Sequence, residues 1–405
     1  MRFCATFGRS AKGMVISLNK LFLIGMGPGD ESLYSNKIKQ TLGMANRVLC
    51  TRDMSLVELM RELRNPDKGD TAVLLSGDCG FFSISKSIIT DFSSFYQIEL
   101  IPGISSISYL SAKIKVSYDD AVLVSLHGRD INIVSKVAYN KKVFALTGGE
   151  NDVRDICRTL CRCRLGDVSV CVGERLSYPD ERIIKEKASV LKDMAFDKLS
   201  VIFIENTSAV NPHSPIYDND FIRSEIPMTK EEVRWLSIRK LGVAPYDIVF
   251  DIGAGTGSVS IEMARKAFDG FVYAIEKNED ACCLVLRNAA LHGAYNIDVI
   301  HGEAPDALEK LPVPDKAFIG GSSNAVDVIV EKLVSLNPNI RITATSITLQ
   351  TLHKLTESFK KYGVTGTDII CVNIAKAKKT GKYDMMVAQN PVYIITGEAQ
   401  CAIER

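Results

Sequence analysis

The sequence predicts an α/β fold that is divided into two domains of different type. From Leu21 onward, short apolar runs alternate with amphipathic segments, which is the pattern of a sheet with crossover helices. Residues 206–224 interrupt this pattern with two prolines and many small polar side chains, as a linker would. A chain of 405 residues is also long for a single hydrophobic core. We therefore predict an N-terminal extension (1–19), a first domain (20–205), a linker (206–224) and a second domain (225–398).

The first domain contains eight short apolar runs, each bounded by polar or turn residues, and each predicts a strand. They are Leu21–Met26, Arg47–Cys50, Thr71–Ser76, Gln97–Pro102, Ala121–His127, Val143–Thr147, Val168–Gly173 and Leu199–Glu205. Five of these strands end in a glycine-containing turn: Gly25–Asp30, Ser76–Gly80, Pro102–Ser106, His127–Arg129 and Thr147–Gly149. Ligands of α/β sheets bind outside the carboxyl ends of the strands, so we expect these turns to converge on one cleft.

The overall composition excludes several classes of protein. A formal net charge of +1 gives no electrostatic reason to expect binding to nucleic acid or to a membrane surface. No apolar run approaches the length of a membrane span. Eleven cysteines without a C-x-x-C pair predict free thiols, a reducing cytoplasm and no metal site. Residues 1–19 carry basic but no acidic side chains, which suits either a weak targeting segment or a reading frame extended before Met14.

A glycine-rich turn marks the second domain. The stretch Ile248–Glu262 (IVFDIGAGTGSVSIE) predicts an apolar strand, a tight turn and the start of a helix. The next strand, Phe271–Ile275, is followed by Glu276, which is placed to accept hydrogen bonds from ribose hydroxyls. Ser258 follows the third glycine, so the spacing is G-x-G-x-G and not that of a dinucleotide site. We expect a nucleoside-type ligand, and the spacing resembles the S-adenosylmethionine loop of the Rossmann-like methyltransferases.

Two further patterns belong to the second domain. Thr229 followed by Glu232 predicts a capping box at a helix start, or alternatively a ligand contact at Thr229. Near the end of the chain, Ile369–Lys376 and Met385–Thr396 predict two strands joined by a lysine-rich connection. As an antiparallel pair, these strands would match the seven-stranded sheet of the methyltransferases.

More specific motifs extend the resemblance over nearly the whole chain. The first domain contains LFLIGMGPGDESL, SGDCGFFS, LIPGISSISYL, SLHGR, LTGG and VGERLSYPDERI, which resemble the tetrapyrrole methylase family and, within it, the CbiE type. The second domain contains IPMTKEEVRWL, DIGAGTGSVSIE, HGEAPDAL and FIGGSS, which are similar to the CbiT type. Their fusion in this order, from about Leu21 to Glu398, resembles the CobL-type family of precorrin-6Y methyltransferases (decarboxylating) of cobalamin biosynthesis.

The resemblance implies that a corrin precursor, precorrin-6B or its cobalt form, is methylated at carbons 5 and 15 and loses carbon dioxide from its carbon-12 acetate. The CbiE-like domain would methylate carbon 5, and the CbiT-like domain would methylate carbon 15 and decarboxylate. One S-adenosylmethionine per domain and a homo-oligomer are also implied. In the first domain, motif matching gives the cofactor contacts Gly27, Pro28, Asp78, Gly103, Ile104, Ser105 and Ser106. In the second domain, it gives Thr229, Gly253, Ala254, Gly255, Thr256, Gly257, Glu276, Glu303 and Ala304.

Cationic side chains should line the substrate cleft, because the implied substrate carries many carboxylates. The candidates are Arg129, Arg234 and Lys378, and His127 is a further candidate for a cofactor or substrate contact. Transfer of an activated methyl group mainly requires the two carbons to be held in line, so no catalytic dyad is required. The catalytic residues are left unassigned.

Two departures from the family pattern bear on these expectations. Cys79 stands where the family's G-D-P turn has proline. Cysteine does not fix the backbone angle φ as proline does, which puts the geometry of the cofactor site in the first domain in question. Ser322–Asn324 stands where more glycine is common, so substrate fit or decarboxylation could differ.

Two other functions are compatible with the motifs. One is a methyltransferase that acts on RNA or protein, and the other is a non-catalytic sensor of S-adenosylmethionine and a corrinoid. The near-zero net charge argues against RNA. The presence of both sets of ligand loops argues against a sensor.

Overall fold

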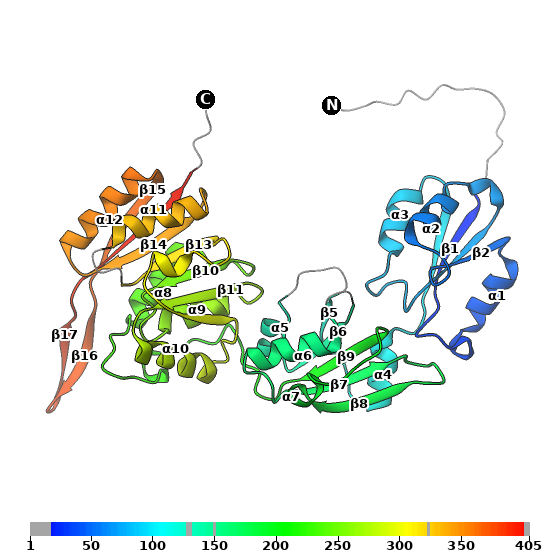
Figure 1. The fold of residues 1–405 in the computed structure, drawn as a ribbon, viewed down its shortest axis with the longest axis horizontal. Helices are drawn as coiled ribbons and strands as arrows, with labels where there is room; N and C mark the ends of the chain where they lie inside the picture. The colour runs from blue at the N-terminus through cyan, green and yellow to red at the C-terminus, as the bar shows by residue number, and fades with distance from the viewer. Residues whose placement is uncertain (1–17, 127–131, 149–150, 322–324, 401–405) are drawn as a thin grey trace, which may run out of the picture. The chain divides into compact units, whose positions relative to one another are not determined.

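The computed structural model describes residues 18–126, 132–148, 151–321 and 325–400 (Figure 1). By their contacts they form two compact units. The first contains the chain up to residue 119 together with 173–183 and 199–201, and the second contains the remainder. The predicted first domain therefore contributes residues to both units. None of the described helices has the length and apolar character needed to span a bilayer.

The first unit is built on a parallel four-stranded sheet in the order β2-β3-β1-β4. Its strands are β1 (Lys20–Gly25), β2 (Arg47–Cys50), β3 (Thr71–Leu75) and β4 (Gln97–Ile101). Its helices are α1 (Asn36–Met44), α2 (Leu56–Leu63), α3 (Ser85–Phe92) and α4 (Ser106–Ile114), with 3₁₀ turns at Glu31–Leu33 and Pro66–Lys68. Successive β1 side chains enter different cores: Leu21 and Leu23 join the cluster of α2 and α3, whereas Phe22 and Ile24 join that of α1. Both faces of β1 are buried, which explains why this strand is continuously apolar after Lys20.

Three of the five turns that were expected to share a cleft, those after β1, β3 and β4, converge at the carboxyl edge of this sheet. His127–Arg129 and Gly149, of the other two turns, lie outside the described residues. Gly27 and Gly77 exchange two backbone hydrogen bonds, at 2.9 and 3.0 Å. The backbone N–H of Gly103 donates to Oδ1 of Asp78 at 3.2 Å. A Cβ atom on Gly103 would lie only 2.2 Å from the carbonyl oxygen of Gly25. The three turns therefore meet backbone against backbone, and the first unit depends on glycine at these positions.

A five-stranded sheet follows in the order β5-β6-β9-β7-β8. Its strands are β5 (Val122–Ser125), β6 (Lys142–Leu146), β7 (Ser169–Glu174), β8 (Arg182–Lys187) and β9 (Ser200–Glu205), and its helices are α5 (Ile133–Tyr139), α6 (Val153–Arg162) and α7 (Ala188–Leu191). All eight predicted strands are confirmed, each within one or two residues, up to the limit of the described residues. Strand β8 was not predicted. Its sequence RIIKEK is largely exposed at the edge of the sheet, so it lacks the apolar signal of a buried strand.

The predicted linker contains no element other than a 3₁₀ turn at Asp218–Asp220. Its second half is nevertheless part of the second domain's core, because Ile216 and Phe221 are buried among the residues of α8 (Glu231–Leu241), α9 (Ser258–Lys266) and α10 (Glu279–Leu291). The side chain of Asn288 accepts from the backbone N–H of Ile222 at 2.8 Å and donates to its carbonyl at 3.1 Å. This segment is thus fixed in place.

The second domain is a seven-stranded sheet in the order β12-β11-β10-β13-β14-β18-β15, with β18 antiparallel to both of its neighbours. Its strands are β10 (Ile248–Ile252), β11 (Phe271–Glu276), β12 (Ile297–His301), β13 (Lys316–Ile319), β14 (Arg341–Ser346), β15 (Val364–Val372) and β18 (Val392–Ala399). Its helices are α8 (Glu231–Leu241), α9 (Ser258–Lys266), α10 (Glu279–Leu291), α11 (Val326–Leu336) and α12 (Leu349–Lys361), with a 3₁₀ turn at Asp306–Leu308. Helices α8–α10 pack on one face and α11 and α12 on the other (Figure 1). The predicted antiparallel pair is confirmed.

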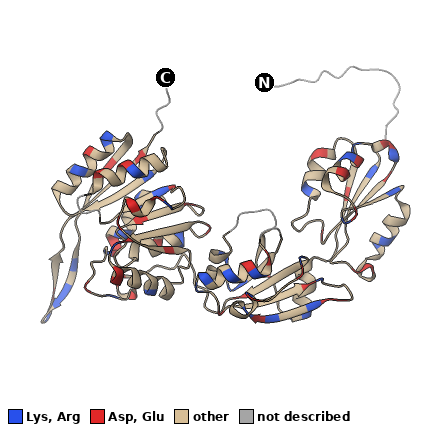
Figure 2. Ribbon diagram, viewed as in Figure 1, with Lys and Arg blue, Asp and Glu red and all other residues tan. Residues whose placement is uncertain are grey.

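The lysine-rich connection between the last two sheet strands is itself a β-ribbon. Strands β16 (Ala375–Thr380) and β17 (Tyr383–Ala388) pair only with each other and project from the sheet. Figure 2 shows lysine residues along this ribbon. The bounds predicted for both strands are wrong, because Ile369–Lys376 is divided between β15 and β16 and Met385–Thr396 is divided between β17 and β18. Residues 375–388 are exposed except Lys376. Because these strands have no buried face, the sequence lacks the apolar pattern that would predict them.

Replacing Gly103 by alanine is expected to destabilise the first unit by on the order of 3 kcal/mol, because the new methyl group would overlap the backbone of Gly25. Urea unfolding followed by circular dichroism measures this change. Gly43→Ala is the matched control: a Cβ atom there meets nothing within 4 Å, and the exchange within α1 should stabilise by up to about 1 kcal/mol. Equal stability of the two variants would contradict the close approach.

Candidate functional site

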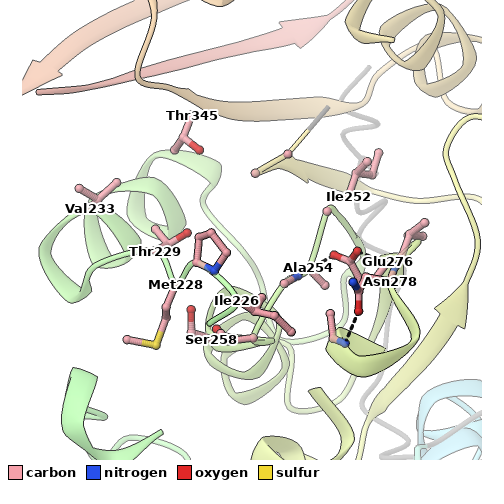
Figure 3. A pocket seen from close by; sticks show the side chains of 18 of the residues that line it. Ile226, Met228, Thr229, Val233, Ile252, Ala254, Ser258, Glu276, Asn278 and Thr345 are labelled. Atoms are coloured by element: carbon pink, nitrogen blue, oxygen red, sulfur yellow. Dashed lines mark hydrogen bonds between the residues drawn. The ribbon is translucent and has the colours of Figure 1, made fainter. Parts of the chain in front are cut away.

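A cleft of about 1050 Å³ opens at the carboxyl edge of the seven-stranded sheet (Figure 3). The loops after β10, β11, β12 and β13 contribute to its lining. Eight of the nine residues predicted for this site line the cleft: Thr229, Gly253, Ala254, Gly255, Thr256, Glu276, Glu303 and Ala304. Gly257 is the exception. It precedes α9 with a φ of 77°, and a Cβ atom there would lie 2.8 Å from Cγ1 of Val285, so this glycine serves the packing of α9 against α10.

The glycine turn after β10 owes its shape to positive φ angles, 78° at Gly253 and 55° at Gly255. A Cβ atom on Gly253 would lie 2.5 Å from the carbonyl oxygen of Gly321, in the loop after β13. The two loops therefore touch through their backbones. This contact explains why glycine follows both strands in the sequence.

Glu276 is held by two backbone hydrogen bonds at the end of β11. Its Oε2 accepts from the N–H of Gly255 and its Oε1 from the N–H of Asn278, both at 2.9 Å (Figure 3). Each carboxylate oxygen can accept a second hydrogen bond. Glu276 is thus pre-oriented toward the cleft with capacity for a hydroxyl donor. Glu303 lies on the same side and forms a largely exposed ion pair with Lys277 at 3.1 Å.

Two buried polar side chains lie at this turn. The hydroxyl oxygen of Thr256 is buried and has no hydrogen-bond partner among the described residues. Asp251, the penultimate residue of β10, is fully buried and accepts a hydrogen bond from Ser260. Burial raises the pKa of Asp251 to about 7, and the nearby charge of Glu276 contributes to this rise. The unpartnered hydroxyl of Thr256 and the three glycines of the turn fit a polar ligand that approaches the backbone closely.

The predicted capping box at Thr229 is wrong. Helix α8 begins after Lys230, which makes no side-chain cap, and Thr229 lines the cleft instead. The Glu232 carboxylate pairs with Lys376 at 2.7 Å, and Glu231 lies 3.6 Å from the same ammonium group. The hydrogen bond with Glu232 raises the pKa of Lys376. The base of the ribbon is thereby tied to the start of α8.

Sequence reasoning missed a second group of lining residues on the side of the cleft opposite Glu276. Figure 3 shows Met228, Val233 and Thr345 there. The base of the ribbon adds Ile374, Gln389 and Asn390. These residues follow no glycine motif, and the sequence does not indicate that the ribbon returns to the cleft.

The structure contradicts the predicted role of Arg234 in substrate binding. Its side chain is fully buried, and its guanidinium group donates to Glu262, to Asp218 at 3.1 Å and to the carbonyls of Thr229 and Ile216 at 2.8 and 3.2 Å. Its donors are therefore committed within the fold. Lys378 lies on the exposed ribbon and does not line the cleft. Arg129, His127 and Ser322–Asn324 lie outside the described residues.

The residues predicted for the first cofactor site also lie together, at the turns after β1, β3 and β4. Gly27 has a φ of 70°, and a Cβ atom there would lie 3.6 Å from the carbonyl oxygen of Ile104. Ser105 caps α4 by accepting from the N–H of Ser108 at 3.2 Å. Cys79 is buried, and burial raises the pKa of its thiol. Asp78 still reaches Gly103 beside this cysteine, so the three turns meet despite the missing proline.

Two family models match the chain. The model described as tetrapyrrole (corrin/porphyrin) methylases matches residues 57–192, and the one described as a precorrin methyltransferase domain matches 220–398. A precorrin-6Y C(5,15)-methyltransferase (decarboxylating) from Sinorhizobium sp is 28% identical over 84% of this chain and 81% of its own length. A probable cobalt-precorrin-6B C(15)-methyltransferase (decarboxylating) from Saccharolobus solfataricus is 41% identical over 45% of this chain and 94% of its own length. Its counterpart from Sulfurisphaera tokodaii is 39% identical over 45% of this chain and 96% of its own length.

Replacing Arg234 by methionine is expected to destabilise the second domain by about 3–5 kcal/mol, because Asp218 and Glu262 would lose their buried counter-charge. Thermal and urea unfolding measure the loss. Arg239→Met is the control, since Arg239 is exposed on the same helix and its replacement should change stability by less than about 0.5 kcal/mol. A similar effect of both changes would contradict the structural role of Arg234.

Proposed function

Because the chain belongs to the family of decarboxylating precorrin methyltransferases, it is an S-adenosylmethionine-dependent methyltransferase of cobalamin biosynthesis, and we propose that it acts twice on one corrin precursor. The second domain would methylate carbon 15 and remove carbon dioxide from the carbon-12 acetate. The first domain would methylate carbon 5. The single observation that carries the proposal is that both sets of predicted cofactor residues gather at the carboxyl edges of their own sheets.

In the second domain, the residues present fit S-adenosylmethionine. Glu276 would accept from the ribose, the turn at Gly253–Gly257 would admit the cofactor close to the backbone, and the unpartnered hydroxyl of Thr256 would gain a partner. When bound, this cofactor supplies an already activated methyl group. The chain's own task is then to orient both reactants and exclude water, which the apolar side chains of Met228 and Val233 support.

In the first domain, we propose a second S-adenosylmethionine at the converging turns. Gly27, Pro28 and Asp78 would contribute from the turns after β1 and β3, and Gly103–Ser106 from the turn after β4. Arg129 and Lys378 stay candidates for contacts with substrate carboxylates. The described cysteines are free thiols, which supports the predicted location in a reducing cytoplasm.

Mass spectrometry of precorrin-6B, with and without cobalt, after incubation with the protein and S-adenosylmethionine tests this function. We expect a product with two methyl groups gained and one carbon dioxide lost. Glu276→Gln should lose the carbon-15 methylation and the decarboxylation, whereas Gly27→Ala should lose only the carbon-5 methylation. Equilibrium dialysis should count two cofactors per wild-type chain and one in each variant. The absence of product in both metal states would refute the corrin substrate and favour RNA or protein as substrate, or a non-catalytic sensor.

We also propose that the protein is a homo-oligomer that uses the ribbon as a contact. Tyr383, Met385 and Met386 are 77%, 56% and 66% exposed, which is unusual for such side chains on a monomer. The ribbon also has unpaired backbone edges. Light scattering after size-exclusion chromatography should give a multiple of the monomer mass, and a Met385→Ser, Met386→Ser double variant should give a smaller species. A monomeric wild type would refute this assembly.

A further inference from the structure

The loop between β7 and β8, residues 175–181, is held in a costly backbone conformation. Arg175 and Ser177 have φ angles of 45° and 67°, in the left-handed region that costs a non-glycine residue about 1–2 kcal/mol. Neighbouring groups fix this conformation. The N–H of Ser177 donates to Glu181 at 2.7 Å, and the hydroxyl oxygen of Ser177 accepts from the N–H of Asp30 at 3.0 Å. The loop is therefore fastened to the turn that follows β1.

Tyr178 links this loop to the same turn and to two arginines. Its ring occupies the space beside Gly29, where a Cβ atom would lie 2.6 Å from Cε2 of the ring. The guanidinium carbons of Arg175 and Arg52 lie 4.9 and 5.6 Å from the ring centroid. Arg52 follows β2, so it stands at the same carboxyl edge as the turns after β1, β3 and β4. A cationic and aromatic shelf thus borders the proposed cofactor turns of the first domain.

The two arginines differ in their partners. The Nε atom of Arg175 lies 2.6 Å from a carboxylate oxygen of Asp180, which lowers the pKa of Asp180. Arg52 is exposed, and no described carboxylate lies within ion-pair distance of it. Stacking on Tyr178 uses the face of a guanidinium group and leaves its N–H edges available. The guanidinium group of Arg52 is therefore oriented by Tyr178, and its N–H donors have no hydrogen-bond acceptor among the described residues.

We propose that Arg52, stacked on Tyr178 beside Arg175, binds a carboxylate of the tetrapyrrole substrate of the first domain. This inference rests on the proposed function and adds to it a substrate-binding group that the family motifs did not supply. A carboxylate matches a guanidinium edge with two parallel hydrogen bonds, and the stacked ring reduces the rotamer freedom lost on binding. Arg175, which is already paired with Asp180, also contacts the ring of Tyr178, and Tyr178 acts as the positioning residue for both arginines.

The first experiment compares kinetics of Arg52→Gln with those of the wild type. For carbon-5 methylation, the KM for the corrin should rise on the order of 10- to 100-fold, because a charged hydrogen-bonded pair is lost. The kcat and the KM for S-adenosylmethionine should change less than twofold, and carbon-15 methylation by the same chain should be unaffected. Arg52→Lys, which restores charge without the fork, should recover part of the loss. Arg61→Gln, an exposed arginine on α2, is the control, and an equal KM in it and Arg52→Gln would overturn the proposal.

A binding measurement separates failure of this inference from failure of the proposed function. Uroporphyrin, a tetrapyrrole with eight carboxylates, serves as the probe, and fluorescence titration gives its affinity without turnover. We expect the wild type to bind it and Arg52→Gln to bind it on the order of 10-fold more weakly, whether or not methylation of precorrin is observed. Equal affinity in the two proteins, or no binding to the wild type, would refute the proposal that Arg52 binds a substrate carboxylate. Absence of methylation alone would refute only the proposed function.

Discussion

In both domains, the loops that leave neighbouring parallel strands approach until backbone meets backbone. Gly103 meets Gly25 in the first unit, and Gly253 meets Gly321 in the second, each at a distance that no Cβ atom would tolerate. Parallel strands lie less than 5 Å apart, so loops at the same edge compete for little space. Removing the side chains there lets the turns close and leaves backbone N–H groups facing the edge. The position of both proposed cofactor sites follows from this constraint.

A buried network of charges sets the shape of the second cleft. Arg234 connects Asp218 of the linker to Glu262 of α9, and its Nη1 atom also donates to the carbonyl of Thr229 at the rim of the cleft. Glu231 accepts from the N–H of Asp218 at 2.9 Å and lies near Lys376 of the ribbon. Burying Arg234, Asp218 and Glu262 is costly unless every one is paired, so these contacts specify one arrangement of the linker, α8 and α9. The half-exposed ion pair of Lys376 attaches the ribbon base to the start of α8. The wall opposite Glu276 is placed by these contacts.

The two proposed sites differ in the groups that border their glycine turns. In the second domain, a single carboxylate, Glu276, is oriented by two backbone N–H groups and borders an apolar wall. In the first unit, the glycine turns are bordered by the strained loop that carries Arg175 and Tyr178. Strain of this kind persists only where neighbouring contacts overdetermine the backbone, and here they join the loop to the turn after β1.

Most of the buried strands, the glycine turns and the acidic residue at the end of β11 could be predicted from the sequence alone. Strand β3, Thr71–Leu75, was predicted to within one residue, because buried parallel strands are short apolar runs whose signal is local. Eight residues that line the cleft of the second domain followed from the glycine-rich motifs and their resemblance to a known family. The exposed strands β8, β16 and β17 have no such pattern and were missed or merged with others.

The roles of the charged side chains could be recognised only in the folded protein, where their partners are visible. Arg234 resembles a substrate cation in the sequence, yet its carboxylate partners lie 16 and 28 residues away and enclose it completely. Glu232 suits a helix cap, yet it pairs with a lysine of the distant ribbon. Arg52 carries no motif at all, and its meaning depends on Tyr178, which the fold brings beside it. A charge acquires its role from the partners that folding supplies, and those partners are not encoded in the residues next to it.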